Sequence, residues 1–277
     1  MEKKIVFIDV DGTLVGEHGT VPDSARKACI QARKNGHLLY LCTGRSKAEL
    51  YDFILDVGFD GIIGAGGGFV EINNEVLFHK KFQVEDVKAM VDYFQEHGIN
   101  FYLESNGGLF GSENLKTQLN ELIDLVPEDQ REGARRHMDH FVGAMKFGES
   151  LYRDDMNKAC FLESKNISFE QIKEAFGEKF GVIQCTVPMF GENSGEIMIP
   201  NIHKATAIET LLEHLGMSQE QTIAIGDGLN DLEMLEYCAV GIAMGNAKEG
   251  LKEIANYITC DVDDHGLYES FKKFQLI

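Results

Sequence analysis

Two aspartates stand two residues apart at the end of an apolar run near the start of the sequence. The run 5–8 reads Ile-Val-Phe-Ile, and Asp9 and Asp11 follow it. Side chains two apart on an extended chain point to the same side, so both carboxylates face one region. An isolated Asp-x-Asp is usually a pair of solvated turn residues. At the mouth of an apolar strand, however, two acids are costly without a cation or another partner, so we interpret this pair as functional.

A second acidic group follows another apolar run. Asp227 and Asp231 come after residues 223–225 and stand at the head of the next expected helix. Carboxylates in such places are often only helix caps. Parallel strands, however, end at one edge of a sheet, where such sheets bind ligands. Three or more hard oxygen ligands at one edge suit Mg²⁺, so the two acidic groups together predict a magnesium site.

Two weaker signals complete a site for a phosphoryl group. Thr43 and Gly44 follow the apolar run 38–42, and a hydroxyl with nearby backbone N–H groups can hold a phosphoryl oxygen. Lys204 opens an expected helix after the run 197–200. A lone Thr-Gly is a weak signal and a surface lysine is normally a solvated charge, so both assignments depend on the acidic groups.

The elements that must position these residues alternate between strands and helices at both ends of the chain. Strands are expected at 4–10, 38–42, 61–63, 222–225, 240–243 and 257–258, and helices at 22–35, 51–57, 203–214 and 231–237. This rhythm predicts an α/β fold with a parallel sheet. Between about 82 and 193 the pattern changes to helices mixed with hairpin-like strands at 100–103, 158–162 and 182–187. This stretch is expected to be an inserted second domain, and Ser168 with Gln171 predicts a helix capping box inside it.

Composition narrows the possible partners. The 277 residues include 45 Asp and Glu against 26 Lys and Arg, a net charge of −19, which would repel nucleic acid. No run reaches the ~18 apolar residues of a membrane helix, and the first apolar run is too short for a signal peptide. The six scattered cysteines indicate a reducing compartment. We expect a cytoplasmic protein without nucleic-acid or membrane partners, either a monomer or a weak homodimer.

The four segments, in this order, resemble the haloacid dehalogenase-like (HAD) superfamily over nearly the whole chain. Asp9 and Asp11 match its first motif, Thr43 the second, Lys204 the third, and residues 226–231 the fourth. Residues 240–247 and 263–266 are similar to the Cof-type branch, although Ala205 and Gly66-Gly67-Gly68 depart from its usual residues. The resemblance implies a doubly wound parallel-sheet, Rossmann-like core at 1–81 and 194–277, with an inserted α/β cap at 82–193.

The same resemblance implies a Mg²⁺-dependent phosphatase that works through an aspartyl-phosphate intermediate. Asp9 would be the nucleophile and Asp11 the general acid and base. Arg45 would either steer Asp11 or touch the substrate, a choice that the sequence leaves open. The other implied roles are metal binding by Asp9, the Asp11 backbone carbonyl and Asp227, phosphate binding by Thr43, Gly44, Lys204 and Asn230, and orientation of these ligands by Asp231.

The inserted domain is expected to set substrate specificity, because the core motifs recognise only a phosphoryl group and a metal. Asn106, Phe190 and Asn193 are the candidate contacts, since they lie in Gly-rich polar turns. Ordinary surface turns are an equally good interpretation of each. The implied substrate is a small phosphorylated metabolite such as a sugar phosphate or a cofactor phosphate. A phosphomutase on the same fold and a non-catalytic metabolite sensor remain the alternatives.

Overall fold

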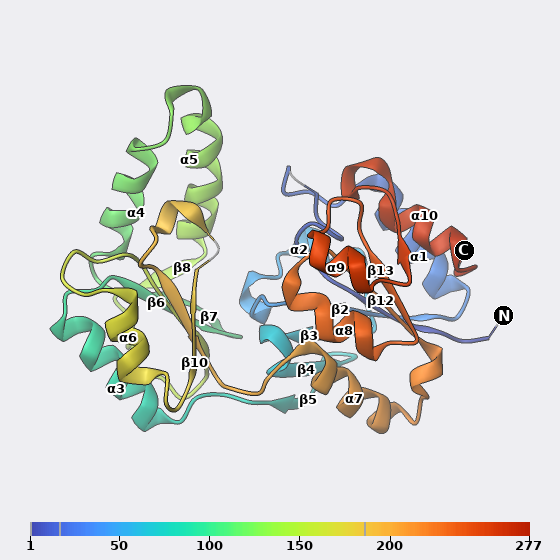
Figure 1. Ribbon diagram of the computed structural model, residues 1–277, viewed down its shortest axis with the longest axis horizontal. Helices are drawn as coiled ribbons and strands as arrows, with labels where there is room; N and C mark the ends of the chain where they lie inside the picture. Colours follow the sequence, from blue (N-terminus) through green and yellow to red (C-terminus); the bar gives the residue numbers. More distant parts are fainter. Residues whose placement is uncertain (1, 17, 186) are drawn as a thin grey trace. The chain divides into compact units, whose positions relative to one another are not determined.

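The computed structural model describes residues 2–16, 18–185 and 187–277, and the chain divides into two compact units (Figure 1). The first unit comprises Met1–Arg45, Leu50–His79 and Ile202–Ile277, and the second comprises Ser46–Glu49 and Lys80–Asn201. Within the described residues, no helix is long and apolar enough to cross a membrane.

The sheet of the first unit has the order β14-β13-β12-β1-β2-β3-β4-β5. Its strands are β1 (Ile5–Ile8), β2 (Leu38–Cys42), β3 (Gly61–Gly64), β4 (Phe69–Ile72), β5 (Glu75–His79), β12 (Thr222–Gly226), β13 (Val240–Ala243) and β14 (Tyr257–Ile258). All neighbours from β14 to β3 are parallel, and the order reverses direction at β1, which makes this a doubly wound sheet. The six parallel strands lie where the apolar runs predicted them.

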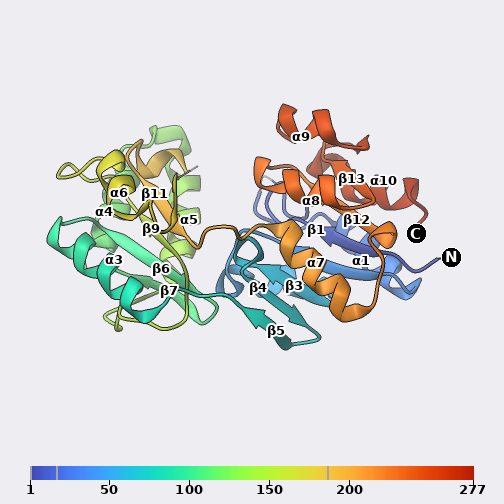
Figure 2. The ribbon, with the colours of Figure 1, turned by 60° about the horizontal axis from the view of Figure 1, so that its bottom comes forward.

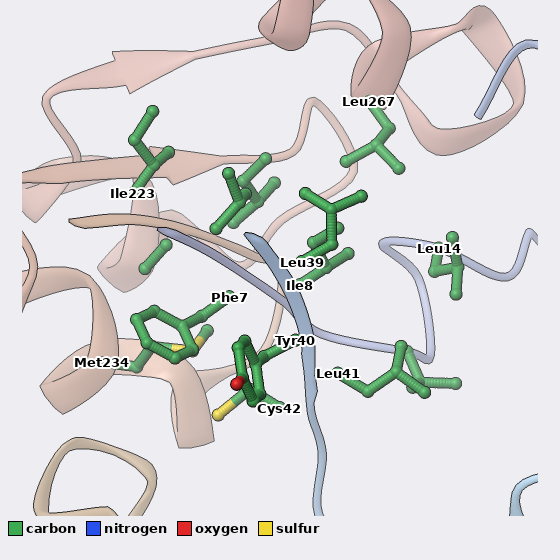
Figure 3. Packing of buried hydrophobic residues seen from close by; sticks show 14 of the residues in the cluster. Phe7, Ile8, Leu14, Leu39, Tyr40, Leu41, Cys42, Ile223, Met234 and Leu267 are labelled. Carbon is green, nitrogen blue, oxygen red and sulfur yellow. The ribbon is translucent and has the colours of Figure 1, made fainter. Parts of the chain in front are cut away.

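Helices cover both faces of this sheet, as Figure 1 shows with α1 and α10 on one side and α7 and α8 on the other. The helices of the unit are α1 (Asp23–Lys34), α2 (Asp52–Leu55), α7 (Lys204–Leu215), α8 (Leu232–Tyr237), α9 (Glu249–Ile254) and α10 (Gly266–Lys273). Because both faces are covered, β1 is buried at every position. Phe7 of β1 and Tyr40 of β2 pack in the core with their ring centroids 6.1 Å apart (Figure 3).

A hairpin that the sequence analysis did not predict forms one edge of this sheet. Strands β4 and β5 pair antiparallel to each other, and β4 pairs antiparallel to β3 (Figure 2). The connecting residues Asn73 and Asn74 have φ angles of 49° and 69°, the left-handed values that a two-residue hairpin turn requires. The stretch before the second unit is therefore strand, not only loop.

The second unit is a separate sheet with the order β10-β11-β9-β6-β7-β8. Its strands are β6 (Phe101–Ser105), β7 (Gly108–Gly111), β8 (Met145–Phe147), β9 (Met156–Phe161), β10 (Gly181–Gln184) and β11 (Gly195–Met198). Its helices are α3 (Val84–Glu96), α4 (Leu115–Asp124), α5 (Glu128–Gly143) and α6 (Phe169–Phe176). The predicted capping box is confirmed: Ser168 accepts from the Gln171 N–H, and the Gln171 side chain accepts from the Ser168 N–H.

Alternation along β6 divides the residues between the two faces of this sheet. Phe101 and Leu103 pack in one apolar cluster with α3 and α6, whereas Tyr102 packs in another with α4 and α5.

Short 3-10 helices occur in both units: η1 (Lys47–Glu49), η2 (Ala65–Gly67), η3 (Pro188–Phe190), η4 (Gln219–Gln221), η5 (Leu229–Asp231) and η6 (Val262–Asp264).

The boundaries of the second unit differ from the expected range 82–193 in three places, the smallest being that the unit begins at Lys80. Residues 194–201 were assigned to the core, but they carry β11, which pairs with β9 and β10 inside the second sheet. Ser46–Glu49 was also assigned to the core and belongs with the second unit. This segment belongs with the second unit because its hydrogen-bond partners lie there: buried Ser46 donates to Glu104, and the Lys47 N–H donates to Asn106.

Candidate active site

Three carboxylates gather at the carboxyl edge of the first sheet. Asp9 follows β1 and its N–H donates to the carbonyl of Ile225 in β12, which keeps the ends of the two strands level. Asp227 and Asp231 follow β12, and Asp231 lies at the end of η5. One carboxylate oxygen from each of Asp9, Asp227 and Asp231 lies within 4.8 Å of the others. The strand ends therefore bring together acids that are more than 200 positions apart in sequence.

Lys204 is the cation inside this acidic group. It is the first residue of α7, and only 2% of its surface is exposed. Its Nζ lies 2.6 Å from Asp9 Oδ1 and 2.5 Å from Asp231 Oδ1. Burial alone would lower the pKa of Lys204, but the two carboxylates outweigh burial and raise the pKa above its ordinary value. Lys204 is therefore a charged, buried residue rather than a solvated surface lysine.

Asp231 is held on both of its carboxylate oxygens. Oδ1 accepts from Lys204, and Oδ2 accepts the backbone N–H groups of Asp227 and Gly228 at 3.1 and 3.0 Å. These bonds fix the turn after β12 and the position of the Lys204 ammonium at once. Orientation of the metal and phosphate ligands by Asp231 stays a prediction, and these three bonds are the contacts through which it would act.

Asp11 points its carboxylate toward a different partner. Arg45 Nε donates to Asp11 Oδ2 at 2.8 Å, and Arg45 Nη2 donates to Asp11 Oδ1 at 2.6 Å. The Asp11 side chain is 61% exposed, in contrast to buried Asp9. This contact is the one that steering of Asp11 by Arg45 requires, while a contact between Arg45 and the substrate stays a prediction. A partly exposed acid beside a buried one is the arrangement needed for different chemical tasks.

Thr43 and Gly44 lie beside this group at the end of β2. Thr43 is buried, and its Oγ1 accepts the N–H of Arg45 at 3.1 Å, which leaves the hydroxyl proton to donate elsewhere. A Cβ placed on Gly44 would lie 3.8 Å from the Asn230 side-chain nitrogen. The predicted phosphate-binding residues from β2 and from the turn after β12 are therefore neighbours at the same edge.

Two residues of this edge were not assigned a role from the sequence. Thr13 Oγ1 donates to Asp227 Oδ1 at 3.2 Å, and Asn246 Nδ2 donates to the carbonyl of Gly12 at 2.8 Å. Thr13 follows Asp11 by two positions, and Asn246 lies in the run 240–247. The partner of each is remote in sequence, and no spacing rule points to it.

The loop at 64–68 also receives a physical explanation. A Cβ on Gly67, whose φ is 109°, would lie 2.5 Å from the carbonyl oxygen of His203. The loop thus packs closely against the residue that precedes Lys204, which only glycine permits.

The charge balance of the site favours a bound cation. Burial and the nearby Asp231 raise the pKa of Asp9 to about 8, although Lys204 opposes the shift. The same two causes raise the pKa of Asp227 to about 6. One lysine does not neutralise three carboxylates, so the remaining repulsion disfavours their ionised forms. The donors are all hard oxygens, as Mg²⁺ prefers, and the residues present therefore fit this metal.

The candidate specificity residues lie in the second unit and have partners of their own. Asn106 Oδ1 accepts from the Lys47 N–H and from the Asn157 side chain. Phe190 is 5% exposed and packs in the cluster with Tyr102. Asn193 accepts from the Phe169 N–H and donates to Glu163. These contacts give Phe190 and Asn193 packing and hydrogen-bonding roles; substrate contact by any of the three stays a prediction.

Comparisons with known proteins agree over almost the full length of the chain. Residues 6–271 match a family described as haloacid dehalogenase-like hydrolases. YkrA of Bacillus subtilis, named as a candidate phosphatase, is 28% identical over 288 residues and covers 100% of both chains. YcsE of the same organism, named 5-amino-6-(5-phospho-D-ribitylamino)uracil phosphatase, is 26% identical, covering 99% of this chain and 96% of its own.

Solved structures share the fold. A protein from Geobacillus kaustophilus HTA426 aligns with a TM-score of 0.82 at 24% identity and covers 100% of both chains. The sugar phosphatase BT4131, of HAD subclass IIB, aligns with a TM-score of 0.74 at 24% identity, covering 99% of this chain and 100% of its own. At this identity the likeness establishes a common fold.

Proposed function

Since the chain belongs to the haloacid dehalogenase-like hydrolases and is a phosphatase of phosphate monoesters, we propose that it transfers the phosphoryl group to Asp9 and then to water. The observation that carries this proposal is the group at the carboxyl edge of the first sheet, where buried Asp9 lies 2.6 Å from the buried Lys204 ammonium. Splitting one difficult displacement into two steps lowers the barrier of each.

Asp9, Asp227 and the backbone carbonyl of Asp11 are the groups that we assign to Mg²⁺. When bound, the metal would neutralise the phosphoryl charge and favour the ionised form of the nucleophile. Asp231 is not assigned to the metal, because both of its oxygens already accept hydrogen bonds from Lys204 and two backbone N–H groups. Its role is to fix the turn that presents Asp227.

In the first step, a carboxylate oxygen of Asp9 attacks phosphorus and the bond to the ester oxygen breaks. Asp11 in its acid form donates a proton to the leaving oxygen, so an alcohol departs and Asp9 carries the phosphoryl group. Lys204 holds the Asp9 carboxylate in place and balances charge on the phosphoryl oxygens, with help from the Thr43 hydroxyl, the Gly44 backbone and Asn230.

In the second step, a water molecule attacks phosphorus and the Asp9–phosphorus bond breaks. Asp11, now a carboxylate, removes a proton from this water, and inorganic phosphate leaves. Proton transfer through a positioned group contributes ~10² to 10⁴ in rate. Arg45 holds the Asp11 carboxylate by two charge-assisted hydrogen bonds, so release from Arg45 must accompany the uptake of a proton by Asp11.

The substrate that we propose is a small phosphorylated metabolite, either a sugar phosphate or the phosphate of a cofactor or its precursor. Two relatives support this range, since YcsE is named for a phosphoribitylamino-uracil and BT4131 for sugars. We assign discrimination among such esters to the second unit, with Asn106 as the first residue to test. Mutation of Asn106 to Ala should reduce kcat/KM for the natural ester more than for a small aryl phosphate.

The free state of all six cysteines supports a reducing compartment, and we propose the cytoplasm.

Release of inorganic phosphate from a panel of phosphate esters tests the function. With Mg²⁺ the purified protein should hydrolyse at least one sugar or cofactor phosphate, and excess EDTA should stop the reaction. The Asp9→Asn variant should bind the ester and release no phosphate, while its circular dichroism stays that of the wild type. A fully active Asp9→Asn variant would place the nucleophile elsewhere. Isomer exchange without phosphate release would instead identify a mutase.

A further inference from the structure

Asn246 joins two segments of the first unit that are far apart in sequence. Its Nδ2 donates to the carbonyl of Gly12 at 2.8 Å, and its Oδ1 accepts the N–H of Val262 at 2.9 Å. The turn that carries Asn246 is itself pinned, because the Met244 N–H donates to Gly226 and the Gly245 N–H donates to Cys260. The side chain is thus a bridge between the turn after β1 and the segment before α10.

Gly12 occupies a constrained position directly after Asp11. Its φ is 77°, and a Cβ at this residue would lie 2.3 Å from Asp227 Oδ2. The N–H of Gly12 donates to the Val15 carbonyl at 2.9 Å. In a trans peptide the C=O points opposite to the N–H, so this bond also fixes the direction of the Asp11 carbonyl. Asn246 holds the next peptide through the Gly12 carbonyl, so both peptides around Gly12 are tied.

We propose that Asn246 is a positioning residue for the metal site, acting through Gly12 to hold the Asp11 carbonyl, which would bind Mg²⁺, in one orientation. This inference rests on the proposed function, in which that carbonyl is a ligand. Asn246 is placed in no reacting role. Its action is to remove the freedom of the Gly12 backbone, which glycine would otherwise retain more than any other residue.

The amide group is the chemical reason for asparagine at this position. It offers a donor to the Gly12 carbonyl and an acceptor to the Val262 N–H at once. An aspartate of the same shape would keep the acceptor but set a carboxylate oxygen against the Gly12 carbonyl. Asn246→Asp therefore replaces the hydrogen bond to the Gly12 carbonyl by a repulsive contact between two oxygens, without changing the side-chain volume. Loss of partners that orient metal ligands typically weakens metal binding by ~10- to 100-fold.

The test measures Mg²⁺ affinity by calorimetric titration of the full chain without substrate, beside Tm at saturating Mg²⁺. Asn246→Asp and Asn246→Ala should bind Mg²⁺ about 10- to 100-fold more weakly than the wild type. Asn35→Ala is the matched control. Asn35 also donates to a remote carbonyl, that of Leu276 at 2.8 Å, and accepts from Gln31 at 2.9 Å, but outside the site. It should change Tm and leave Mg²⁺ affinity unaltered.

The outcomes separate this inference from the function on which it rests. Wild-type Mg²⁺ affinity in both Asn246 variants would overturn the positioning role and leave the phosphatase proposal standing. Equal losses of affinity in the Asn246 and Asn35 variants would mean a general loss of stability and would also overturn it. A wild-type chain that hydrolyses esters without binding Mg²⁺ would refute the metal assignment and the inference together. If Asn246→Asp does not fold, Asn246→Ala decides the question.

Discussion

Arg45 and Asp11 form a two-pronged ion pair in which Nε meets Oδ2 at 2.8 Å and Nη2 meets Oδ1 at 2.6 Å. Both carboxylate oxygens of Asp11, the residue that we propose as acid and base, are therefore engaged by one guanidinium. This geometry belongs to arginine, because lysine presents a single point charge instead of a planar fork. Arg45 thus orients the Asp11 carboxylate, and in the proposed mechanism it must release this carboxylate when Asp11 takes up a proton.

Removal of this pair should slow the reaction without unfolding the protein. Hydrogen bonds to charged groups contribute ~1.5–3 kcal/mol. Arg45→Ala removes the two bonds that orient Asp11 for proton transfer, so it should lower kcat by about 10- to 100-fold. Arg45→Lys should recover only part of the loss. Steady-state kinetics check this, with Arg33→Lys as a matched control, since Arg33 makes the same two-pronged contact with Asp60 away from the site. An unchanged kcat in Arg45→Ala would show that catalysis does not need Arg45.

Replacement of Lys204 by Met should destabilise the fold as well as stop turnover. Without the ammonium, the buried Asp9 and Asp231 carboxylates lose the cation that they share, and Asp231 keeps only its two backbone bonds. Loss of such a buried partner typically costs ~3–5 kcal/mol in the free energy of unfolding. Urea denaturation measures the cost, and Lys252→Met, which breaks only an exposed pair with Glu249, should cost at most about 1 kcal/mol. Asp231→Asn added to Lys204→Met should restore part of the stability. Equal costs for the two lysines would contradict the ion network.

Replacement of Asp11 by Asn should trap the phosphorylated enzyme. Asp9 stays able to attack an aryl phosphate, whose leaving group needs little protonation, but water is no longer activated and its attack slows by ~10²- to 10⁴-fold. Mass spectrometry of the intact chain should then detect a phosphoryl adduct on Asp11→Asn and none on Asp9→Asn. An adduct that appears equally on both variants would exclude Asp9 as the acceptor.

Stability should depend on pH and Mg²⁺ together. The pKa of Asp9 is raised from 3.8 to about 8 and that of Asp227 to about 6, so the folded metal-free chain binds protons more tightly than the unfolded chain. The contribution of these two aspartates to the free energy of unfolding should therefore fall as pH rises from about 4 to about 8. Mg²⁺ binds the ionised carboxylates and offsets the loss, so it should raise Tm more at about pH 8 than at about pH 5.

Thermal scans with and without Mg²⁺ at the two pH values check this expectation. Burial and Glu104 also raise the pKa of Glu49 to about 8 in the second unit, so only the Mg²⁺-dependent part of the change reports on the site. Asp227→Asn should abolish that part. A Tm rise that is the same at both pH values would mean that Mg²⁺ does not compete with protons at these aspartates.

The parallel core and its edge could be predicted because each depends on local sequence. Apolar runs such as 5–8 mark buried strands, and a parallel sheet collects their carboxyl ends, which brings Asp9 and Asp227 together whatever lies between them. The capping box at Ser168 is equally local. These features need no knowledge of partners remote in the chain.

Other features depend on long-range partners or on weak local signals. The turn of the β4–β5 hairpin is Asn73-Asn74, a weaker turn signal than Asn-Gly. The hairpin also adds antiparallel strands to the sheet, which the alternation of strands and helices does not predict. Strand β11 lies between the turn at 188–194 and Lys204, and its pairing with β9 and β10 is what reveals that it belongs to the second unit. The Asn246–Gly12 contact joins residues 234 positions apart, which no periodicity can reveal.

The short segment Ser46–Glu49 has a consequence for modularity. Buried Ser46 is bonded to Glu104 and Asn157, so the second unit is assembled from two stretches of sequence, 46–49 and 80–201. If 80–201 were expressed as an independent fragment, the buried side chains of Glu104 and Asn157 would lose the Ser46 hydroxyl as a hydrogen-bond partner. Transplantation of this cap onto another phosphatase core would therefore have to carry both stretches, and recombination at a single pair of breakpoints would leave the graft incomplete.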